Sequence, residues 1–509
     1  MSDSRITNSS LEAQRHRLRA RGICVIIPTY NNAGTIVDVV ERAMAQCLDV
    51  IVVCDGCTDN SVELLGNMPT KPVIIELKRN QGKGAALREG FRYAIRSGFA
   101  YAITLDGDGQ HYPEDISVLL AANERNAGAL IVGERKNLEK MERSKGSKFA
   151  NSFSNFWFMV QTGKYLRDTQ TGYRLYPLKK LRGLALLTSR YEAELELMVF
   201  ASWHGVKLVS EPVNVFYPPR EERVSHFRPG KDFTRITILN MVLCLLAIIY
   251  GLPLRLFRFT ARLLRSIYTF VVFFFFSVFI MTPMSYIYMS IGKINDKKRS
   301  KLRRILRFAA KTAMVYHGLP GTTYTEHNPH DEKYDKPAVI ICNHQSFFDL
   351  MAVISQTEKL VVVTAAWVMK VRFFRYTIYN AEYLPASDGI DQMLPQLRSL
   401  VDRGYSIAIF PEGTRSKDGS ILRFHKGAFH MAQELGVDIL PLMVYGTGRV
   451  LPKHAYMMSK GEIHLYIGKR LSPVEMRSYG STLQEQAQAM RKYYKVRYSE
   501  VADKLDQNA

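Results

Sequence analysis

Cysteine is scarce in this chain of 509 residues, and what there is forms no recognisable framework. Six cysteines are too few for the disulfide network of a secreted domain. Cys54 and Cys57 form one CxxC pair, but no second pair stands at a spacing that would complete a zinc site. The first 21 residues hold no apolar core, so we expect no cleavable signal peptide. These absences predict a protein whose working parts stay in the cytoplasm.

Acidic residues are also few: 47 Asp and Glu stand against 69 Lys and Arg, which gives a net charge of +22. This balance suits an anionic partner, either nucleic acid or an acidic membrane surface. Thirteen basic residues and one acid fall within residues 255–311, beside two long apolar runs. We therefore expect an anionic membrane as partner, and no nucleic acid. Hydrophobic residues make up 47% of the chain, which excludes global disorder, and the length calls for two or three domains.

Strand-like and helix-like segments alternate from residue 23 onward. Strands are predicted from Ile23 and over 50–54, 73–77 and 101–105, with helices over 35–47 and 84–97. This alternation indicates a parallel sheet covered by helices, the α/β class. In such sheets ligands bind beyond the carboxyl ends of the strands, which is where Asp55, Asp106 and Asp108 stand.

The pair Asp106 and Asp108 suits a hard cation. Alternate carboxylates at a strand end can face one ion, whose other ligands are waters and phosphate oxygens. The nearby run RNQGKG (79–84) supplies cations, glycines and a helix start, all of which suit phosphate. Either motif alone could equally be a set of polar loop caps on an α/β domain.

Five motifs in order across residues 23–236 resemble the family 2 glycosyltransferases of GT-A (Rossmann-like) fold. They are PTYNN (28–32), DGCTDNS (55–61), RNQGKGAALREGF (79–91), TLDGDGQHYPED (104–115) and DTQTGYRLY (168–176). The sequences of the last two motifs are most similar to the branch of the family that transfers sugars to polyprenyl phosphates. Cys57 stands where the family commonly has Ser.

The resemblance implies a role for each matching residue. Asp55 would hold the nucleotide of a nucleotide-sugar, while Asp106 and Asp108 would bind Mg²⁺ or Mn²⁺ on its diphosphate. Arg174 would face the acceptor phosphate or the diphosphate. Further substrate contacts are implied at Pro28, Tyr30, Asn31, Arg79 and Lys83.

A hydroxyl acceptor would also need a general base. Asp168 and Glu194 are the candidates, and Asp168 is the residue we predict as catalytic. An acceptor that is already an anionic phosphate would need no base. The sequence leaves this choice open.

Two apolar runs follow, over 236–254 (19 residues) and 267–292 (26 residues), each long enough to span a bilayer. The linker between them, RLFRFTARLLRS, carries four arginines that two full crossings would leave outside, against the positive-inside tendency. A single crossing would put the flanking domains on opposite faces. We therefore expect a membrane-inserted, hairpin-like unit that keeps both domains on the cytoplasmic face of the inner membrane.

Another apolar strand is predicted over 338–342 and runs toward His344, with Asp349 five residues further on. Five helical residues subtend about 140°, so the two side chains would not share one helix face. We expect His344 at a strand-to-helix turn, with Asp349 in the helix turning back toward it. An Asp that pairs with a His orients its imidazole and raises its basicity, as a general base requires.

NHQSFFD (343–349), FPEGTRS (410–416) and ILPLMV (439–444) resemble in order the glycerolipid acyltransferases, across about residues 311–505. The resemblance implies that His344, supported by Asp349, deprotonates an acceptor hydroxyl that attacks an acyl thioester. The donor would be acyl-carrier protein or acyl-coenzyme A. The acceptor site would be shaped by Glu412, Gly413, Thr414 and Arg415, with Arg415 pairing with an anionic group.

One segment departs from that acyltransferase pattern. Enzymes that acylate glycerol phosphates usually carry, between the two motifs, an Arg that helps to hold the acceptor phosphate. Here the corresponding segment is AEYLPAS (381–387), with Pro385 and Ala386 where an acidic residue and the Arg would stand. We therefore expect a glycolipid or other hydroxylated lipid, rather than lysophosphatidic acid, as the preferred acceptor. Arg372 and Arg375 are near enough in sequence to substitute.

The whole sequence predicts two transferases joined by a membrane unit. The expected divisions are a polar tail (1–22), a glycosyltransferase domain (23–235), membrane segments (236–292) and an acyltransferase domain (293–509). A lipid acceptor shared by both enzymes would explain the fusion. The alternatives are a phospholipid acyltransferase with an accessory glycosyltransferase domain, or a membrane scaffold without catalysis.

Overall fold

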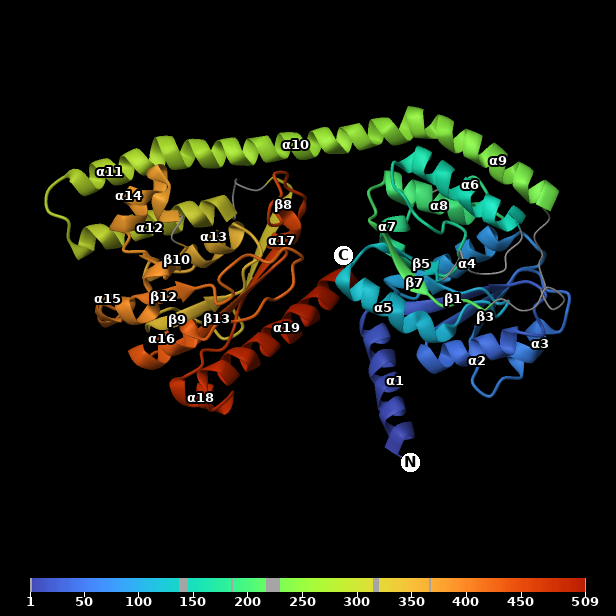
Figure 1. Cartoon of the computed structure of the whole chain (residues 1–509), viewed down its shortest axis with the longest axis horizontal. Coiled ribbons are helices and arrows are strands. Elements are labelled where there is room, and N and C mark those ends of the chain that lie inside the picture. The colour runs from blue at the N-terminus through green and yellow to red at the C-terminus, as the bar shows by residue number, and fades with distance from the viewer. Residues whose placement is uncertain are drawn as a thin grey trace. The chain divides into compact units, whose positions relative to one another are not determined.

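The computed structural model describes residues 2–136, 145–184, 186–216, 229–314, 320–365 and 368–508. Two compact units make up the chain: Met1–Arg258 with Asp503–Ala509, and Phe259–Ala502. Each unit contains its own seven-stranded sheet with helices against it (Figure 1). The predicted α/β class is confirmed for both.

The first sheet runs in the order β3-β2-β1-β4-β6-β5-β7. Neighbouring strands are parallel except at β6, which is antiparallel to both β4 and β5. Its strands are β1 (Ile23–Thr29), β2 (Val50–Cys54), β3 (Val73–Glu76), β4 (Tyr101–Thr104), β5 (Leu130–Arg135), β6 (Arg174–Pro177) and β7 (Leu208–Val213). Its helices are α1 (Ser2–Ala20), α2 (Ile36–Gln46), α3 (Ser61–Gly66), α4 (Lys83–Arg96), α5 (Ile116–Arg125), α6 (Lys145–Thr162), α7 (Leu178–Leu181) and α8 (Glu192–Trp203).

The central strand β1 is buried on both faces, as its unbroken apolar sequence predicts. Ile23, Val25 and Ile27 face a core shared with α1, α2 and α5. Cys24 and Ile26 point the other way, into a core shared with α4. Side chains alternate along a strand, so α1, α2 and α5 cover one face of the sheet and α4 covers the other. The carboxyl ends of β1, β2 and β4 meet at one edge because these strands are parallel.

The second sheet runs in the order β11-β10-β12-β9-β13-β14-β8. Its pairs are parallel except for the antiparallel β13 and β14. The strands are β8 (Thr322–His327), β9 (Ala338–Cys342), β10 (Leu360–Thr364), β11 (Leu384–Pro385), β12 (Ser406–Ile409), β13 (Asp438–Tyr445) and β14 (Gly461–Ile467). The helices are α12 (Asp296–Thr312), α13 (Phe348–Ile354), α14 (Arg372–Asn380), α15 (Ile390–Asp402), α16 (Gly427–Leu435), α17 (Thr447–Val450), α18 (Pro473–Ser478) and α19 (Leu483–Asn508).

One long helix replaces the hairpin that the sequence predicted between the apolar runs. α9 (Pro229–Leu246), α10 (Leu252–Phe275) and α11 (Thr282–Ser290) are joined by the π-helical turns Ala247–Gly251 and Phe276–Met281. Within the described residues, Thr234–Ser290 is the one helix long and apolar enough to cross a membrane, by length and composition. The expected turn is absent because the arginine linker consists largely of good helix formers. Each π turn lies just before a proline, Pro253 or Pro283, and accommodates the backbone bond that proline cannot make.

The arginines of that linker contact protein carbonyls. Arg255 donates to Thr162 O (2.8 Å) and Arg258 to Trp203 O (3.2 Å), the last residues of α6 and α8. A cation is favoured there because helix C-termini carry unpaired carbonyls and partial negative charge. In the second unit, Arg262 donates to the carbonyls of Met457 and Met458. Each of these three arginines therefore has a hydrogen-bond partner in the protein, although Arg255 and Arg258 remain exposed.

Two candidate active sites

The first site lies at the carboxyl edge of the first sheet, where the loops after β1 and β2 are tied together. Asn31, with a positive φ of 52°, donates from Nδ2 to Thr58 Oγ1 (3.0 Å) and accepts from Thr58 N (2.8 Å). Pro28 is buried in β1 and Tyr30 is partly exposed just beyond it. The predicted substrate residues of the first motif thus line this edge.

Asp55 is buried, and it holds in place the loop formed by residues 79–84. Its two carboxylate oxygens accept the backbone N–H groups of Gln81 (2.8 Å) and Gly82 (2.7 Å). Gly56, at φ 68°, lies so close to this loop that a Cβ there would come within 2.4 Å of the backbone of Arg79 and Asn80. The predicted role of Asp55 in holding a nucleotide stays a prediction, and what the geometry adds is a positioning role toward the loop. Arg79 is exposed at the loop surface.

Lys83 forms ion pairs with two acidic residues of this site. Its Nζ lies 2.6 Å from Asp106 Oδ1 and 2.8 Å from Glu194 Oε2. Burial disfavours the ammonium ion, but the charges of Asp106 and Glu194 hold the pKa of Lys83 above its ordinary value. Burial likewise opposes ionisation of Asp106, and the charges of Lys83 and His111 keep its pKa below the ordinary value. Gly172 is required here, since a Cβ would come within 2.4 Å of Asp106.

Asp108 remains the under-compensated carboxylate. Burial, together with the negative charge of Asp106, raises the pKa of Asp108 to about 6. A divalent cation would relieve this repulsion, and two adjacent carboxylates form the donor set of an ion that takes its other ligands from diphosphate and water. No group of three or more His, Cys, Asp or Glu in the described part of the chain could hold a metal. Asp106 and Asp108 by themselves thus fit a divalent ion only if a diphosphate supplies further ligands.

Arg174 lies deeper than the sequence predicted for a contact with acceptor phosphate. Its side chain is 1% exposed and donates to Tyr176 Oη (3.1 Å), Glu194 O (3.0 Å) and Thr169 O (2.8 Å). The antiparallel register of β6 against Thr104 of β4 sets the position of this residue. These contacts favour a structural role, and a contact with substrate stays a prediction.

Asp168, the predicted general base, is engaged in a buried ion pair. Its carboxylate accepts from Arg135 Nε (2.6 Å) and Arg135 Nη2 (2.8 Å), and the side chain is 0% exposed. The alternative base, Glu194, is held by Lys83. Both candidates are thus engaged in ion pairs, and the role of either as the base stays a prediction.

We expect Asp168→Asn to lower the stability of the first unit by about 3–5 kcal/mol, because it removes the fully buried carboxylate charge that pairs with the Arg135 guanidinium. Thermal unfolding of the full chain measures this effect, with the exposed Asp38→Asn as the matched control. A base would instead show normal unfolding and a lost acid limb in the pH profile of sugar transfer. That combination would contradict a purely structural role for the ion pair.

The second site lies at the carboxyl edge of the second sheet. His344 follows β9, and its Nδ1 lies 3.1 Å from Asp349 Oδ2 at the start of α13. The predicted strand-to-helix geometry is confirmed. Asp349 is fully buried. It also accepts hydrogen bonds from the backbone N–H groups of Gln345 and Ser346 and from the hydroxyl of Thr447.

Glu412 joins the two motifs of this site. Its Oε1 accepts from His344 N (2.9 Å), and its Oε2 accepts from Leu422 N (2.9 Å). Burial raises the pKa of Glu412 to about 7, against the lowering effect of these two hydrogen bonds. Gly413 follows at φ 68°. Glu412 therefore positions the histidine loop in addition to its predicted place in the acceptor site.

The raised pKa of Glu412 gives a pH signature. The folded chain binds a proton here below pH 7, whereas an unfolded glutamate releases its proton above about 4.5. Within this window the folded state binds more protons, so this group's contribution to stability falls as pH rises from 4.5 to 7. Glu412→Gln should lose this contribution, so that the stability of the wild type relative to the variant falls as pH rises from 4.5 to 7. An unchanged slope in urea unfolding at several pH values would contradict it.

Two residues of this site were not predicted from the sequence. Lys453 donates from Nζ to Thr414 Oγ1 (2.9 Å) and Arg415 O (2.9 Å), which fixes the acceptor loop. Thr447 supports Asp349 from the start of α17. No local motif marks either residue, and the Gly446-Thr447-Gly448 turn after β13 is the only signal that could have pointed to Thr447. The guanidinium of Arg415 has no acceptor among the described residues.

Comparison with known proteins agrees with the division into two sites. Residues 24–179 match the family model described as Glycosyl transferase family 2, and residues 323–445 match the model described as Acyltransferase. A UDP-N-acetylglucosamine–dolichyl-phosphate N-acetylglucosaminyltransferase of Methanococcus voltae is 28% identical over 217 residues, 38% of this chain and 86% of that protein. The chain therefore carries a glycosyltransferase domain and an acyltransferase domain.

The acyltransferase relatives are matched over a smaller share of their length. The chloroplastic 1-acyl-sn-glycerol-3-phosphate acyltransferase BAT2 of Brassica napus is 35% identical over 140 residues, 26% of this chain. The chain spans about two fifths of that relative, 41% of its length. The solved structure of the acyltransferase PlsC from Thermotoga maritima covers 49% of this chain and 98% of its own, with 21% identity and a TM-score of 0.40.

Proposed function

We propose that this two-domain transferase is bifunctional and membrane-associated. Residues 23–235 transfer a sugar from a nucleotide-sugar to a lipid-linked acceptor, and residues 293–509 transfer an acyl group from a thioester to a lipid hydroxyl. The proposal rests on one observation. Each unit has a set of ionisable side chains at the carboxyl edge of its own sheet. They are Lys83, Asp106 and Asp108 in the first unit, and His344 and Asp349 in the second.

For sugar transfer, an anionic phosphate acceptor suits this site better than a hydroxyl. Both candidate bases, Asp168 and Glu194, are held in ion pairs. An ionised phosphate oxygen attacks the sugar without prior deprotonation, so no base is needed. A metal bound at Asp106 and Asp108 would neutralise charge on the departing nucleoside diphosphate. The Methanococcus voltae relative is named for a dolichyl-phosphate acceptor, which supports a polyprenyl phosphate here.

For acyl transfer, Asp349 holds Nδ1 of His344, which leaves Nε2 to accept the proton of the lipid hydroxyl. The resulting oxygen nucleophile attacks the thioester carbonyl. The carbon–sulfur bond breaks, and the thiol of acyl-carrier protein or coenzyme A leaves with a proton. The guanidinium of Arg415, which has no acceptor in the described part of the chain, offers an anionic part of the substrate a partner.

The long helix supports association with an anionic membrane. Thr234–Ser290 would be about 85 Å long, against a hydrocarbon core of about 30 Å, so most of it could not lie inside a single crossing. Its exposed side chains are largely apolar, whereas Arg255, Arg258 and Arg262 contact protein. Large exposed side chains include Ile238, Met241, Leu245, Ile248, Leu256, Phe257, Phe259, Leu264, Phe274 and Phe279. We propose that this face enters the cytoplasmic leaflet of the inner membrane, with both domains on the cytoplasmic side.

The acceptor of the acyltransferase is tested by competition. The segment with Pro385 and Ala386 lies at the carboxyl end of β10, at the same edge as His344. Loss of a bidentate anion clamp should cost about 1.5–3 kcal/mol of binding, or one to two decades in affinity. With a labelled acyl donor in one membrane assay, we expect a glycolipid to outcompete lysophosphatidic acid.

Two other outcomes of that assay are informative, and so is one variant. Preference for lysophosphatidic acid would leave an ordinary phospholipid enzyme with an accessory glycosyltransferase domain. No transfer to any lipid, together with no release of nucleoside diphosphate from a panel of nucleotide-sugars, would indicate a non-catalytic scaffold. An Arg375→Ala variant, which removes an exposed cation near the acceptor segment, shows whether that arginine substitutes for the missing clamp.

A further inference from the structure

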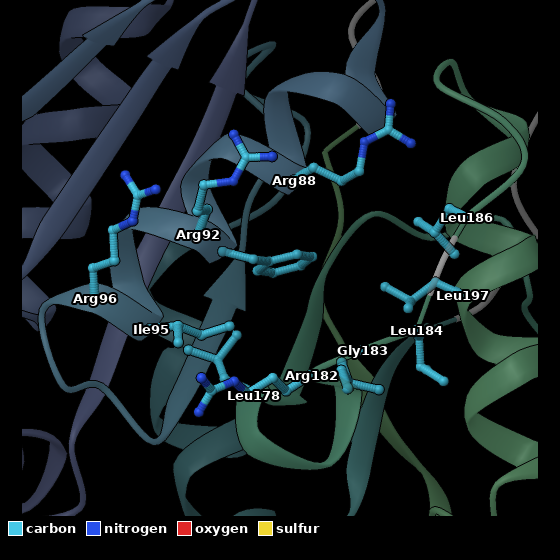
Figure 2. Close-up of a pocket in the computed structure, with 12 residues that line it drawn as sticks. Arg88, Arg92, Ile95, Arg96, Leu178, Arg182, Gly183, Leu184, Leu186 and Leu197 are labelled. Atoms are coloured by element: carbon cyan, nitrogen blue, oxygen red, sulfur yellow. The ribbon is translucent and has the colours of Figure 1, made fainter.

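A second concave site lies on the first unit, on the face of the sheet that α4 covers. A pocket of about 460 Å³ opens between α4, the segment 178–186 and α8 (Figure 2). Its floor is apolar, with Phe91 and Ile95 from α4 opposite leucines such as Leu184 and Leu197. None of the groups assigned above to sugar transfer lines it.

Four arginines surround this apolar floor, and no acidic residue lines the pocket. Arg88, Arg92 and Arg96 follow one another along one side of α4, and Arg182 comes from the segment just after α7, below Ile95 in the view (Figure 2). Arg88 donates to Thr188 O (2.8 Å), and Arg92 pairs with Glu89. The guanidinium groups of Arg96 and Arg182 have no acceptor in the part of the chain that the structure describes. Two uncompensated cations therefore stand at the rim of an apolar hollow.

The pocket is too far from the first active site to hold the reacting phosphate. α4 begins at Lys83, which contacts Asp106, and Arg92 and Arg96 lie 9 and 13 residues further along the same helix. At 1.5 Å per residue, these arginines are about 13–20 Å from Lys83. A phosphate bound at Arg96 or Arg182 would consequently be a lasting ligand and not the group that attacks the sugar.

The neighbourhood of the pocket is suited to lipid. α8 contacts α4 on one side and contacts α6 and α9 on the other. α6 and α9 expose large apolar side chains, namely Phe149, Phe156, Met159, Val160, Ile238, Met241 and Leu245. One helix, α8, thus separates the arginine rim from the apolar helices that we assign to the membrane.

We propose that this pocket is a binding site for an anionic phospholipid. The phosphate binds at the arginine rim, where Arg96 and Arg182 have no acceptor among the described residues, and one acyl chain covers Phe91, Ile95 and the leucines of the floor. A free phosphate would pair with the arginines but leave the apolar floor exposed to water. A zwitterionic lipid would place the positive charge of its headgroup beside the arginines. The proposal rests on the proposed membrane association and is independent of either catalytic activity.

Equilibrium binding to the full chain in neutral detergent micelles tests the proposal. The probes are labelled phosphatidylglycerol and phosphatidylcholine at matched mole fraction. The variant Arg96→Ala/Arg182→Ala should bind phosphatidylglycerol about tenfold or more weakly, since each charge-assisted contact to phosphate is lost. Arg19→Ala/Arg125→Ala is the matched control, because it removes the same charge from α1 and α5 on the opposite face of the sheet.

A second variant separates lipid from phosphate. Ile95→Asn makes the floor polar while keeping all four arginines. It should weaken the binding of phosphatidylglycerol and leave unchanged the extent to which inorganic phosphate competes for the arginines. Equal loss in the matched control, equal binding of phosphatidylcholine, or full displacement by millimolar phosphate would each overturn the proposal. Sugar and acyl transfer measured on the same preparations report separately on the proposed function, and both should persist in the arginine variant.

Discussion

Asp108→Asn should abolish sugar transfer by the full chain and leave acyl transfer unchanged. The amide keeps the size of the side chain but removes the charge that a divalent ion needs. Loss of several kcal/mol of transition-state stabilisation corresponds to a fall of about two to three decades in rate. Acyl transfer should persist because His344 and Asp349 belong to a different compact unit with its own sheet.

Initial rates of both reactions on one preparation test this, with Asp38→Asn on the exposed surface of α2 as the control. The fold should survive, since ionised Asp108 is disfavoured by burial and by Asp106 in the first place. Excess chelator should reproduce the loss in the wild type and have no further effect on the variant. Undiminished sugar transfer by the variant, or full wild-type activity in chelator, would remove the metal from the assignment.

The local parts of both sites could be predicted from the sequence. An apolar run that ends at a polar cluster specifies both a strand and its functional end, and β2 and β9 have the predicted limits of 50–54 and 338–342. The turn that brings Asp349 to His344 needs six residues of sequence. Local backbone preference and the strand-to-helix transition decide such features, so one sequence is enough.

The networks around those residues could not be predicted in this way. Glu412 reaches the His344 backbone across 68 residues, and Thr447 reaches Asp349 across 98. Similarly, the burial of Arg174 depends on the register of β6 against β4, and the ion pair of Asp168 with Arg135 depends on where β5 lies. Such pairings are set by sheet topology, which a motif read along the chain does not contain.

The hairpin prediction failed for a related reason. It treated the linker arginines as ligands of lipid headgroups or water, because the sequence does not show what lies beside them. In the structure, Arg255 and Arg258 meet the C-terminal carbonyls of α6 and α8, and these contacts compensate their charge. Once they are satisfied by protein, nothing requires the chain to turn back at this point.

His344→Ala should stop acyl transfer while the chain stays folded. Removing a general base costs about two to four decades in rate. The side chain is 20% exposed, so little packing is lost. Asp349 is not left unpaired, because it keeps the hydroxyl of Thr447 and the backbone N–H groups of Gln345 and Ser346. Loss of the imidazole therefore removes the base and leaves its support in place.

Unfolding temperature and both transferase rates, measured on the same preparation, decide the role of this histidine. His330→Ala, at an exposed position of the same unit, is the matched control. A catalytic histidine predicts a normal unfolding temperature, normal sugar transfer and no acyl transfer. A histidine that merely fills space beside Phe410, whose ring centroid is 4.2 Å away, predicts a lower unfolding temperature and partial retention of acyl transfer. That second result would leave the second site without a base, since no other side chain described there pairs with Asp349 through a titratable nitrogen.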